Sequence, residues 1–184
     1  GAVTLAGAEF EVVDLPGTHS LLPDTEDERV AFRFLSECAE SGEDLLVLCV
    51  AEASNLSNDL ALAAGLKAAG YPVVLVVNMI DEARLNGIRA DADALCESLG
   101  CPVALASART GEGMHAVLRL LSPRPLRADL SEALDFRRAP RRRLRDLQEL
   151  SIQKAERAVR AAVTLPQRVL LPTLSRSIRI DRVL

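Results

Sequence analysis

The sequence predicts an α/β fold with a mainly parallel sheet, followed by a small helical segment. Strand and helix signals alternate over the first 123 residues, and this alternation is typical of parallel strands that are joined by helices. The runs at residues 45–50 and 73–77 are continuously apolar, which favours strands that are covered on both faces. We therefore expect ligands to bind beyond the carboxyl ends of these strands.

The predicted elements begin with a hairpin and a capped helix. Residues 3–5 and 10–13 are strand-like and flank a short Gly-containing turn. Thr25 and Glu28 have the spacing of a capping box, and apolar residues at helical spacing follow them. This pattern predicts a helix over residues 25–40.

The alternation continues up to residue 122, and glycines close two of the helices. The predicted elements are a strand at 45–50, a helix at 55–69, a strand at 73–77, a helix at 91–99, a strand at 102–105 and a helix at 113–121.

Prolines divide the chain into three parts. Residues 1–122 are the expected body, 123–174 a helical or linker segment, and 175–184 a short amphipathic terminus. A long helix is expected over residues 144–163, with inward-facing residues Leu147, Leu150, Ala155, Ala158, Val159 and Ala162. The first residue is Gly rather than Met, so we expect an internal piece of a longer chain.

Composition argues against several classes of protein. The 184 residues are 49% hydrophobic and 26% charged, which is too apolar for a disordered chain, yet no apolar run reaches the roughly 18 residues that span a bilayer. Aromatic residues make up 3%, with no Trp, so stacking on single-stranded nucleic acid is poorly supplied. Four cysteines without a CxxC pair favour a reduced setting without a metal site.

Charge is distributed unevenly along the chain. Residues 1–123 hold 7 Lys and Arg against 19 Asp and Glu, whereas residues 124–184 hold 15 against 7. The basic part contains an Arg cluster, which we define as Arg137, Arg138, Arg141, Arg142, Arg143 and Arg145. Such a cluster can be a solvent-exposed helix face, or it can bind anionic lipid headgroups or nucleic acid. We rank lipid headgroups, or docking onto the acidic body, above nucleic acid.

The first motif with chemical potential is Asp14-Leu15-Pro16-Gly17, which follows the strand predicted at residues 10–13. An aspartate at a strand's carboxyl end can hold Mg²⁺ through a water molecule, and a glycine there lets its N–H approach a terminal phosphate. A turn in which the aspartate caps a helix is the alternative. Asp14 is thus a candidate metal residue, and both Asp14 and Gly17 are candidates for binding the phosphate end of a nucleotide.

Two further motifs, Asn78-Met79-Ile80-Asp81 and Ser107-Ala108-Arg109, follow the strands predicted at 73–77 and 102–105. The Asp81 carboxylate can accept two N–H bonds from guanine, and Asn78 can brace the neighbouring loops. The Ala108 N–H can donate to the guanine carbonyl oxygen, with Ser107 beside it. Each motif alone is common by chance, but their order and their positions at strand ends are specific together.

These motifs resemble the GTPase superfamily and, more closely, the FeoB-type ferrous iron transporters. The similarity rests on residues 13–21, 27–31, 55–56, 78–81, 107–113 and 179–184. It implies a P-loop GTPase-like fold in the cytosolic part of a membrane transporter, at the cytoplasmic face of the cell membrane. There, binding and hydrolysis of GTP would be coupled to Fe(II) uptake, with the helix at 144–163 as a candidate transmitter.

The departure from this family is the absence of GxxxxGK[ST], since the only lysines, Lys67 and Lys154, follow no glycine-rich turn. The family's central first strand and phosphate loop are missing with it. GTP or GDP and Mg²⁺ are therefore expected as cofactors only in the intact parent, and this chain is expected not to hydrolyse GTP, with no catalytic residue of its own.

Without that central strand, the strands at 10–13 and 45–50 lose a shared neighbour. They can close together, the sheet can split, or an absent N-terminal segment can fill the slot. That N-terminal segment, a C-terminal membrane domain and guanine nucleotide are the partners that the resemblance implies. The alternatives are a soluble RNA- or ribosome-associated GTPase fragment and a non-catalytic interaction module.

Overall fold

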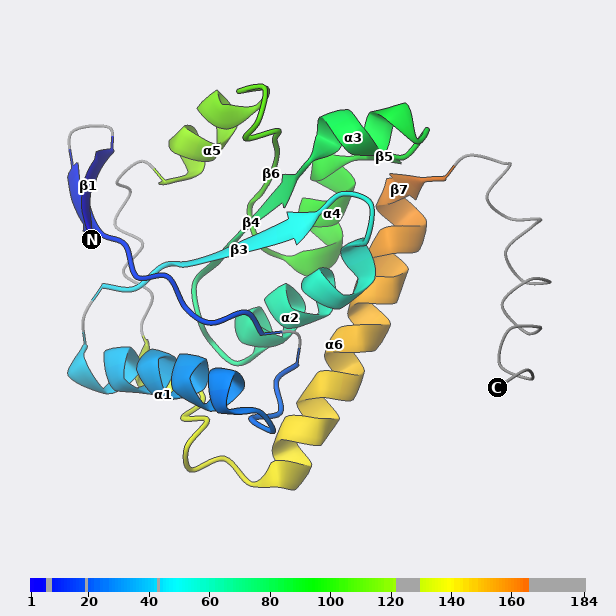
Figure 1. Cartoon of the computed structure of the whole chain (residues 1–184). Helices are drawn as coiled ribbons and strands as arrows, with labels where there is room; N and C mark the ends of the chain where they lie inside the picture. Colours follow the sequence, from blue (N-terminus) through cyan, green and yellow to red (C-terminus); the bar gives the residue numbers. More distant parts are fainter. Residues whose placement is uncertain (6–7, 19, 43, 122–129, 166–184) are drawn as a thin grey trace, which may run out of the picture.

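The computed structural model describes residues 1–5, 8–18, 20–42, 44–121 and 130–165. A three-stranded parallel sheet lies at the centre, in the order β3 (Val47–Glu52), β4 (Val73–Asn78) and β6 (Val103–Leu105) (Figure 1). The prediction of an α/β fold with a mainly parallel sheet is confirmed.

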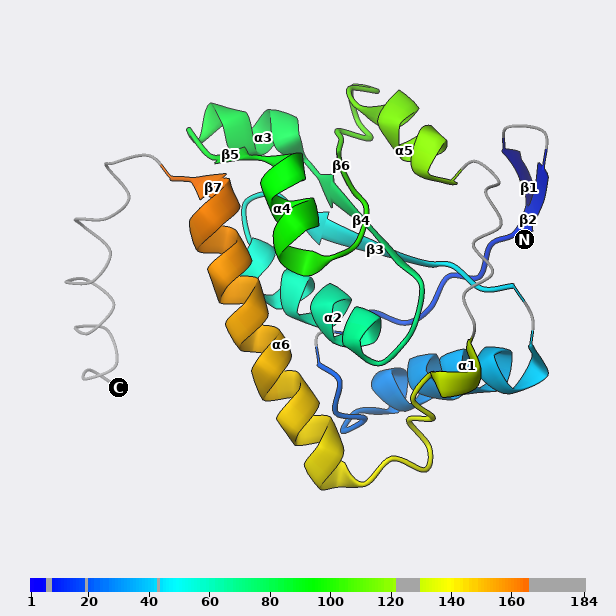
Figure 2. The ribbon, with the colours of Figure 1, turned by 180° about the vertical axis from the view of Figure 1, so that it is seen from behind.

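Helices cover both faces of this sheet unequally. They are α1 (Glu26–Ser41), α2 (Leu56–Ala68), α3 (Ile80–Leu85), α4 (Ala92–Leu99), α5 (Met114–Leu121), the 3₁₀ turn η1 (Leu130–Glu132) and α6 (Arg141–Ala162). Residues of α1, α2, α4 and α6 share one large apolar core with one face of the sheet, whereas α5 packs on the other face (Figures 1 and 2).

Local capping signals explain where two of the helices begin. The N–H of Glu28 donates to Thr25 Oγ1 at 3.2 Å, and the N–H of Thr25 donates to Glu28 Oε2 at 2.9 Å, so the predicted capping box is confirmed. Asp91 caps α4 by accepting from the N–H groups of the next turn, and Gly100 ends it in the left-handed region, with φ +73°.

The N-terminal hairpin stands apart from the central sheet. Among the residues that the structure describes, strands β1 (Ala2–Leu5) and β2 (Ala8–Glu11) pair only with each other, antiparallel. Strand β2 ends at Glu11, so Val12 and Val13 lie outside it and are 53% and 45% exposed. In the described residues the sheet is split between this hairpin and the three central strands, so β2 and β3 have not closed together; that an absent segment fills the slot stays a prediction.

The prediction that β3 is covered on both faces is wrong. Val50 of β3, Val76 of β4 and Ala104 of β6 stand in one row across the sheet. Val76 and Ala104 pack beneath α5, but Val50 is 60% exposed because α5 does not extend over β3. Within the described ranges β3 has β4 as its only strand neighbour. Continuous burial therefore holds for β4 and not for β3.

Helix α6 begins three residues earlier than predicted, and it turns most of the predicted residues inward: Ala155, Ala158 and Ala162 are buried, and Leu147 and Val159 pack partly buried against the core. Its buried residues are Leu144, Ser151, Ala155, Ala158 and Ala162. Leu150 is 64% exposed, which corrects its predicted inward position. The inward face runs through Ser151, and one residue along a helix is a turn of about 100°. After α6, β7 (Val163–Thr164) pairs antiparallel with β5 (Arg89–Ala90).

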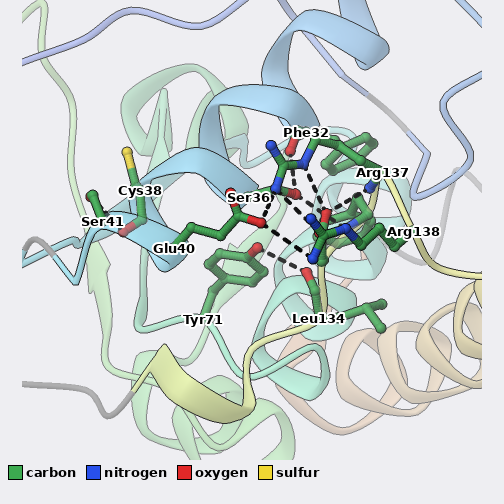
Figure 3. Close-up of polar contacts among 11 residues, drawn as sticks. Phe32, Ser36, Cys38, Glu40, Ser41, Tyr71, Leu134, Arg137 and Arg138 are labelled. Atoms are coloured by element: carbon green, nitrogen blue, oxygen red, sulfur yellow. Dashed lines mark hydrogen bonds and ion pairs between the residues drawn. The ribbon is translucent and has the colours of Figure 1, made fainter.

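An aromatic and ionic cluster joins α1 to the segment that leads into α6 (Figure 3). The rings of Phe32 and Phe136 stack with centroids 4.4 Å apart. The buried Tyr71 hydroxyl donates to Leu134 O at 2.9 Å, and the N–H of Phe136 donates to Ser36 Oγ at 3.1 Å. These bonds hold the residues after η1 against α1.

Half of the Arg cluster docks onto acidic residues of the body. Arg137 and Arg138 pair with Glu40 of α1, and Arg141 pairs with Asp24. Arg142, Arg143 and Arg145 are exposed and form no ion pair with any residue that the structure describes.

The predicted boundary at residue 122 and the predicted terminus at 175–184 lie outside the described residues. No helix in the described part of the chain has the length and apolar character needed to cross a bilayer.

Candidate functional site

Two loops meet at the carboxyl edge of the central sheet. Strands β4 and β6 are parallel neighbours, so the loops that follow them emerge on the same side. The Oδ1 atom of Asn78 accepts from the N–H of Ala108 at 3.0 Å, which ties the second motif to the third. The N–H of Ile80 donates to Ala106 O at 3.3 Å and adds a second link. The structure thus brings together the two motifs that were predicted to form a base-binding pair.

The turn after β4 directs Asp81 toward the neighbouring loop. Met79 has φ +64°, the left-handed region that is uncommon for a residue with a side chain. This turn lets α3 start directly after the strand, so that Asp81 falls in the first turn of the helix. The Asp81 side chain is 14% exposed and lies within reach of the loop after β6.

The loop after β6 is closed by bonds from its own backbone and from Ser107. Ser107 is fully buried; its N–H donates to Glu112 O at 2.8 Å, and its Oγ accepts from the N–H of Thr110 at 3.2 Å. A Cβ at Gly113 would lie 2.0 Å from Leu105 O, so the chain passes the end of β6 where only glycine fits. This loop is rigidly positioned beside Asn78.

Ion pairs join the same loop to α3. Arg109 forms an ion pair with Asp81, and Arg84 Nη2 lies 2.7 Å from Glu112 Oε1. Hydrogen bonding from Ser107, and then from Arg109, holds the pKa of Asp81 below its usual range. Arg84 lowers the pKa of Glu112 in the same way. Asp81 is therefore an ionised acceptor at neutral pH.

The candidate phosphate and metal residues are not part of this assembly. Asp14 and Gly17 are exposed, in extended chain between β2 and α1. Within the described ranges, neither forms a hydrogen bond or ion pair with Asn78, Asp81 or Ala108. Their predicted role stays a prediction.

A single carboxylate suits Mg²⁺ only when nucleotide phosphates supply further oxygen ligands. In the described part of the chain, no cluster of three or more His, Cys, Asp or Glu side chains could hold a metal ion. The role of Asp14 as a metal residue stays a prediction.

The sequence did not predict the pairing of Arg109 with Asp81. The three-residue motif ends in this arginine, but nothing in its spacing showed which acid it meets. Helix α3, which carries both Asp81 and Arg84, was also missed because only six residues form it. The one available signal in the sequence was that the two loops carry side chains of opposite charge.

This chain is similar in sequence to known proteins. The sequence pattern described as "Ferrous iron transport protein B" matches residues 1–121. The Fe(2+) transporter FeoB of Synechocystis sp. is 36% identical over 127 residues, which is 67% of this chain and 20% of that protein. A protein of Porphyromonas gingivalis, a fusion of Fe(2+) transport protein A and Fe(2+) transporter FeoB, is 42% identical over 106 residues, or 58% of this chain and 12% of that protein.

Solved structures agree with the sequence matches. The GMPPNP form of the T. maritima FeoB cytosolic domain superposes with a TM-score of 0.68 at 23% identity, covering 89% of this chain and 84% of that one. The FeoB G-domain of Methanococcus jannaschii gives a TM-score of 0.58 at 31% identity, covering 66% of this chain and 75% of that one.

The sheet and its two joined loops thus have the fold of a P-loop GTPase domain. The chain belongs to the ferrous iron transport protein B family. It spans 12–20% of the length of the two curated relatives compared above. Membership of this family does not favour an RNA- or ribosome-associated GTPase, or a non-catalytic interaction module.

Proposed function

We propose that this chain is the guanine-nucleotide-binding part of a ferrous iron transporter, positioned at the cytoplasmic face of the cell membrane. The observation that carries the proposal is the hydrogen bond from the Ala108 N–H to Asn78 Oδ1. It fixes an ionised carboxylate, Asp81, and a backbone donor on adjacent loops, and these are the groups that a guanine edge requires. The intact parent would couple binding and hydrolysis of GTP to Fe(II) uptake.

Each residue of the two loops has a separate role in this proposal. Asp81 accepts from the N1–H and the exocyclic amino group of guanine, and the Ala108 N–H donates to the carbonyl oxygen. Asn78 braces the two loops, while the buried Ser107 supports Asp81 and closes its own loop. Adenine, which has an amino group in place of the carbonyl and lacks the N1–H, would satisfy neither group.

Asp14 and Gly17 would serve the phosphate end in the intact parent, Asp14 through a water on Mg²⁺ and Gly17 through its N–H. Mg²⁺ there would neutralise charge on the phosphates. Because the chain contains no GxxxxGK[ST] sequence, we expect weak nucleotide binding and no turnover. The N-terminal segment with such a loop and the C-terminal membrane domain are its proposed partners.

Ligand-observed NMR tests the base-reading proposal, because it detects weak binding. Saturation transfer to GDP should exceed that to ADP, and Asp81→Asn should reduce the GDP signal. Asn offers an amide donor where guanine also presents donors, so the same variant should gain signal with xanthosine diphosphate, whose C2 group is a carbonyl acceptor. Equal signals for GDP and ADP, unaffected by Asp81→Asn, would refute the proposal.

We further propose that α6 transmits the nucleotide state of the parent, because it contacts the segment that follows Gly17. The N–H of Leu21 donates to Gln148 Oε1 at 2.6 Å, and Asp24 pairs with Arg141. A change in the Asp14–Gly17 loop would thus reach α6 through a few residues. In the full-length transporter, Gln148→Ala should alter GDP release; unchanged exchange and hydrolysis would rule out this route.

The exposed Arg142, Arg143 and Arg145 support a second proposed contact, with anionic lipid headgroups. Each arginine near such a surface contributes about 1 kcal/mol. Sedimentation with vesicles of phosphatidylglycerol should retain the chain, and replacing all three residues with Gln should release it. Equal retention on neutral phosphatidylcholine vesicles would contradict this contact. Nucleic acid is not a proposed partner.

A further inference from the structure

The carboxylate that we assign to guanine already has a cationic partner from its own chain. Arg109 Nη2 pairs with Asp81 Oδ2, and Arg109 Nε lies 4.0 Å from Glu82 Oε1. The Arg109 side chain is 67% exposed, whereas that of Asp81 is 14% exposed. Arg109 therefore extends along the surface and covers part of the Asp81 carboxylate.

The chemistry of this pair matches that of the expected ligand. A guanidinium presents adjacent N–H donors in one plane, as the N1–H and amino edge of guanine does. The neighbouring Ala108 N–H likewise has a partner in the chain, the side-chain oxygen Oδ1 of Asn78, and a guanine carbonyl would share this donor with Oδ1. Both polar groups of the site are thus satisfied by the chain itself.

We propose that Arg109 is an internal competitor for guanine, a residue that sets nucleotide affinity by occupying Asp81. This rests on the proposed function, since it assumes that Asp81 reads the base. Guanine binds by exchange: the Arg109–Asp81 pair opens, the base edge takes the carboxylate, and Arg109 moves to Glu82, which lies beside it.

The loop does not depend on Arg109 for its position. The Ala108–Asn78 bond, the Arg84–Glu112 ion pair and the bond from the Ser107 N–H to Glu112 O hold it independently. An Arg109→Ala variant should therefore fold and keep the base-reading groups in place. Its circular dichroism and urea midpoint should stay close to those of the wild-type chain.

The test compares two arginines of the same loop pair. Arg109→Ala should tighten GDP binding by about twofold to fivefold, the range expected when a partly exposed ion pair no longer competes. Arg84→Ala is the matched control: it removes the same charge, and Arg84 pairs with Glu112 rather than with Asp81. It should weaken GDP binding, because the Arg84–Glu112 pair helps to hold the loop. Affinities come from saturation-transfer NMR titrations of the full 184-residue chain.

The outcomes separate this inference from the proposed function. If Asp81→Asn weakens GDP binding while Arg109→Ala also weakens it, or has the same effect as Arg84→Ala, Arg109 is not a competitor and the base assignment survives. A weaker Arg109→Ala complex would instead mean that the side chain supports the bound base. If GDP and ADP bind alike and Asp81→Asn changes nothing, the proposed function fails and the inference fails with it.

Discussion

Leu21 lies over Gly65 so closely that no side chain fits between them. A Cβ at Gly65 would be 2.2 Å from Leu21 Cδ1 and 3.0 Å from Ser151 Oγ. Leu21 is fully buried, and it belongs to the segment that follows Gly17. The absence of a side chain at one position of α2 therefore lets that segment, α2 and α6 meet at a single point.

Gly65→Ala should destabilise the chain, although alanine is the better helix former. Overpacking a buried site costs about 1–3 kcal/mol, and the gain in helix propensity offsets up to about 1 kcal/mol. We expect a net loss of about 1–2 kcal/mol in the free energy of unfolding, measured by urea denaturation. In a Leu21→Ala background the same change should cost much less, because the two Leu21 side-chain atoms are gone and only the Ser151 Oγ contact at 3.0 Å remains. An equal loss in both backgrounds would exclude this explanation.

Gly113→Ala should be far more damaging than Gly111→Ala. Both glycines have positive φ, +76° and +81°, so both substitutions carry a backbone penalty of about 1–2 kcal/mol. Only at Gly113 would the new Cβ meet backbone, 2.0 Å from Leu105 O; at Gly111 nothing lies within 4 Å. The difference between the two urea-unfolding free energies should reach about 2 kcal/mol or more. Similar losses would show that the loop relaxes freely.

Substitutions at two valines test whether β4 is buried while β3 is exposed on one face. Val77→Thr places a hydroxyl at a fully buried position of β4 and should cost about 1–3 kcal/mol. Val50→Thr makes the same change at a β3 position that is 60% exposed, so the free energy of unfolding should move by at most about 0.5 kcal/mol. A large loss at Val50 would mean that β3 is covered in solution, by a second copy or another segment.

Most elements could be predicted because their signals are local. Thr25 and Glu28 cap α1 through bonds between near neighbours, and the run over β4 is buried as its composition indicates. The exposure of Val50 and Leu150 could not be predicted, because it depends on which helix covers each position.

The candidate site, too, could be predicted only in part. The positions of Asn78, Asp81 and Ala108 follow from parallel strands that end at one edge, so motif spacing was enough to bring them together. The Arg109–Asp81 pair depends on which rotamer a long exposed side chain takes, and sequence spacing carries no information about that. The role of Asp14 stays a prediction, because it depends on a bound nucleotide.

Asp135 should make stability depend on acidity. The guanidinium of Arg137 holds the pKa of Asp135 at about 2, against about 3.9 in an unfolded chain. A depressed folded pKa stabilises the chain above about pH 4, and this stability is lost as the pH falls toward 2. Because the Asp135 side chain is 23% exposed, we expect this contribution to the free energy of unfolding to be about 1–2 kcal/mol after solvent screening.

Asp135→Asn should thus be destabilised at pH 7, and its urea-unfolding free energy should approach that of the wild-type chain as the pH falls from 4 to 2. Asp146→Asn, an exposed acid on α6, is the control and should show no such convergence. A gap between wild type and Asp135→Asn that stays constant over this range would mean that shape, rather than charge, explains the role of Asp135 beside α1.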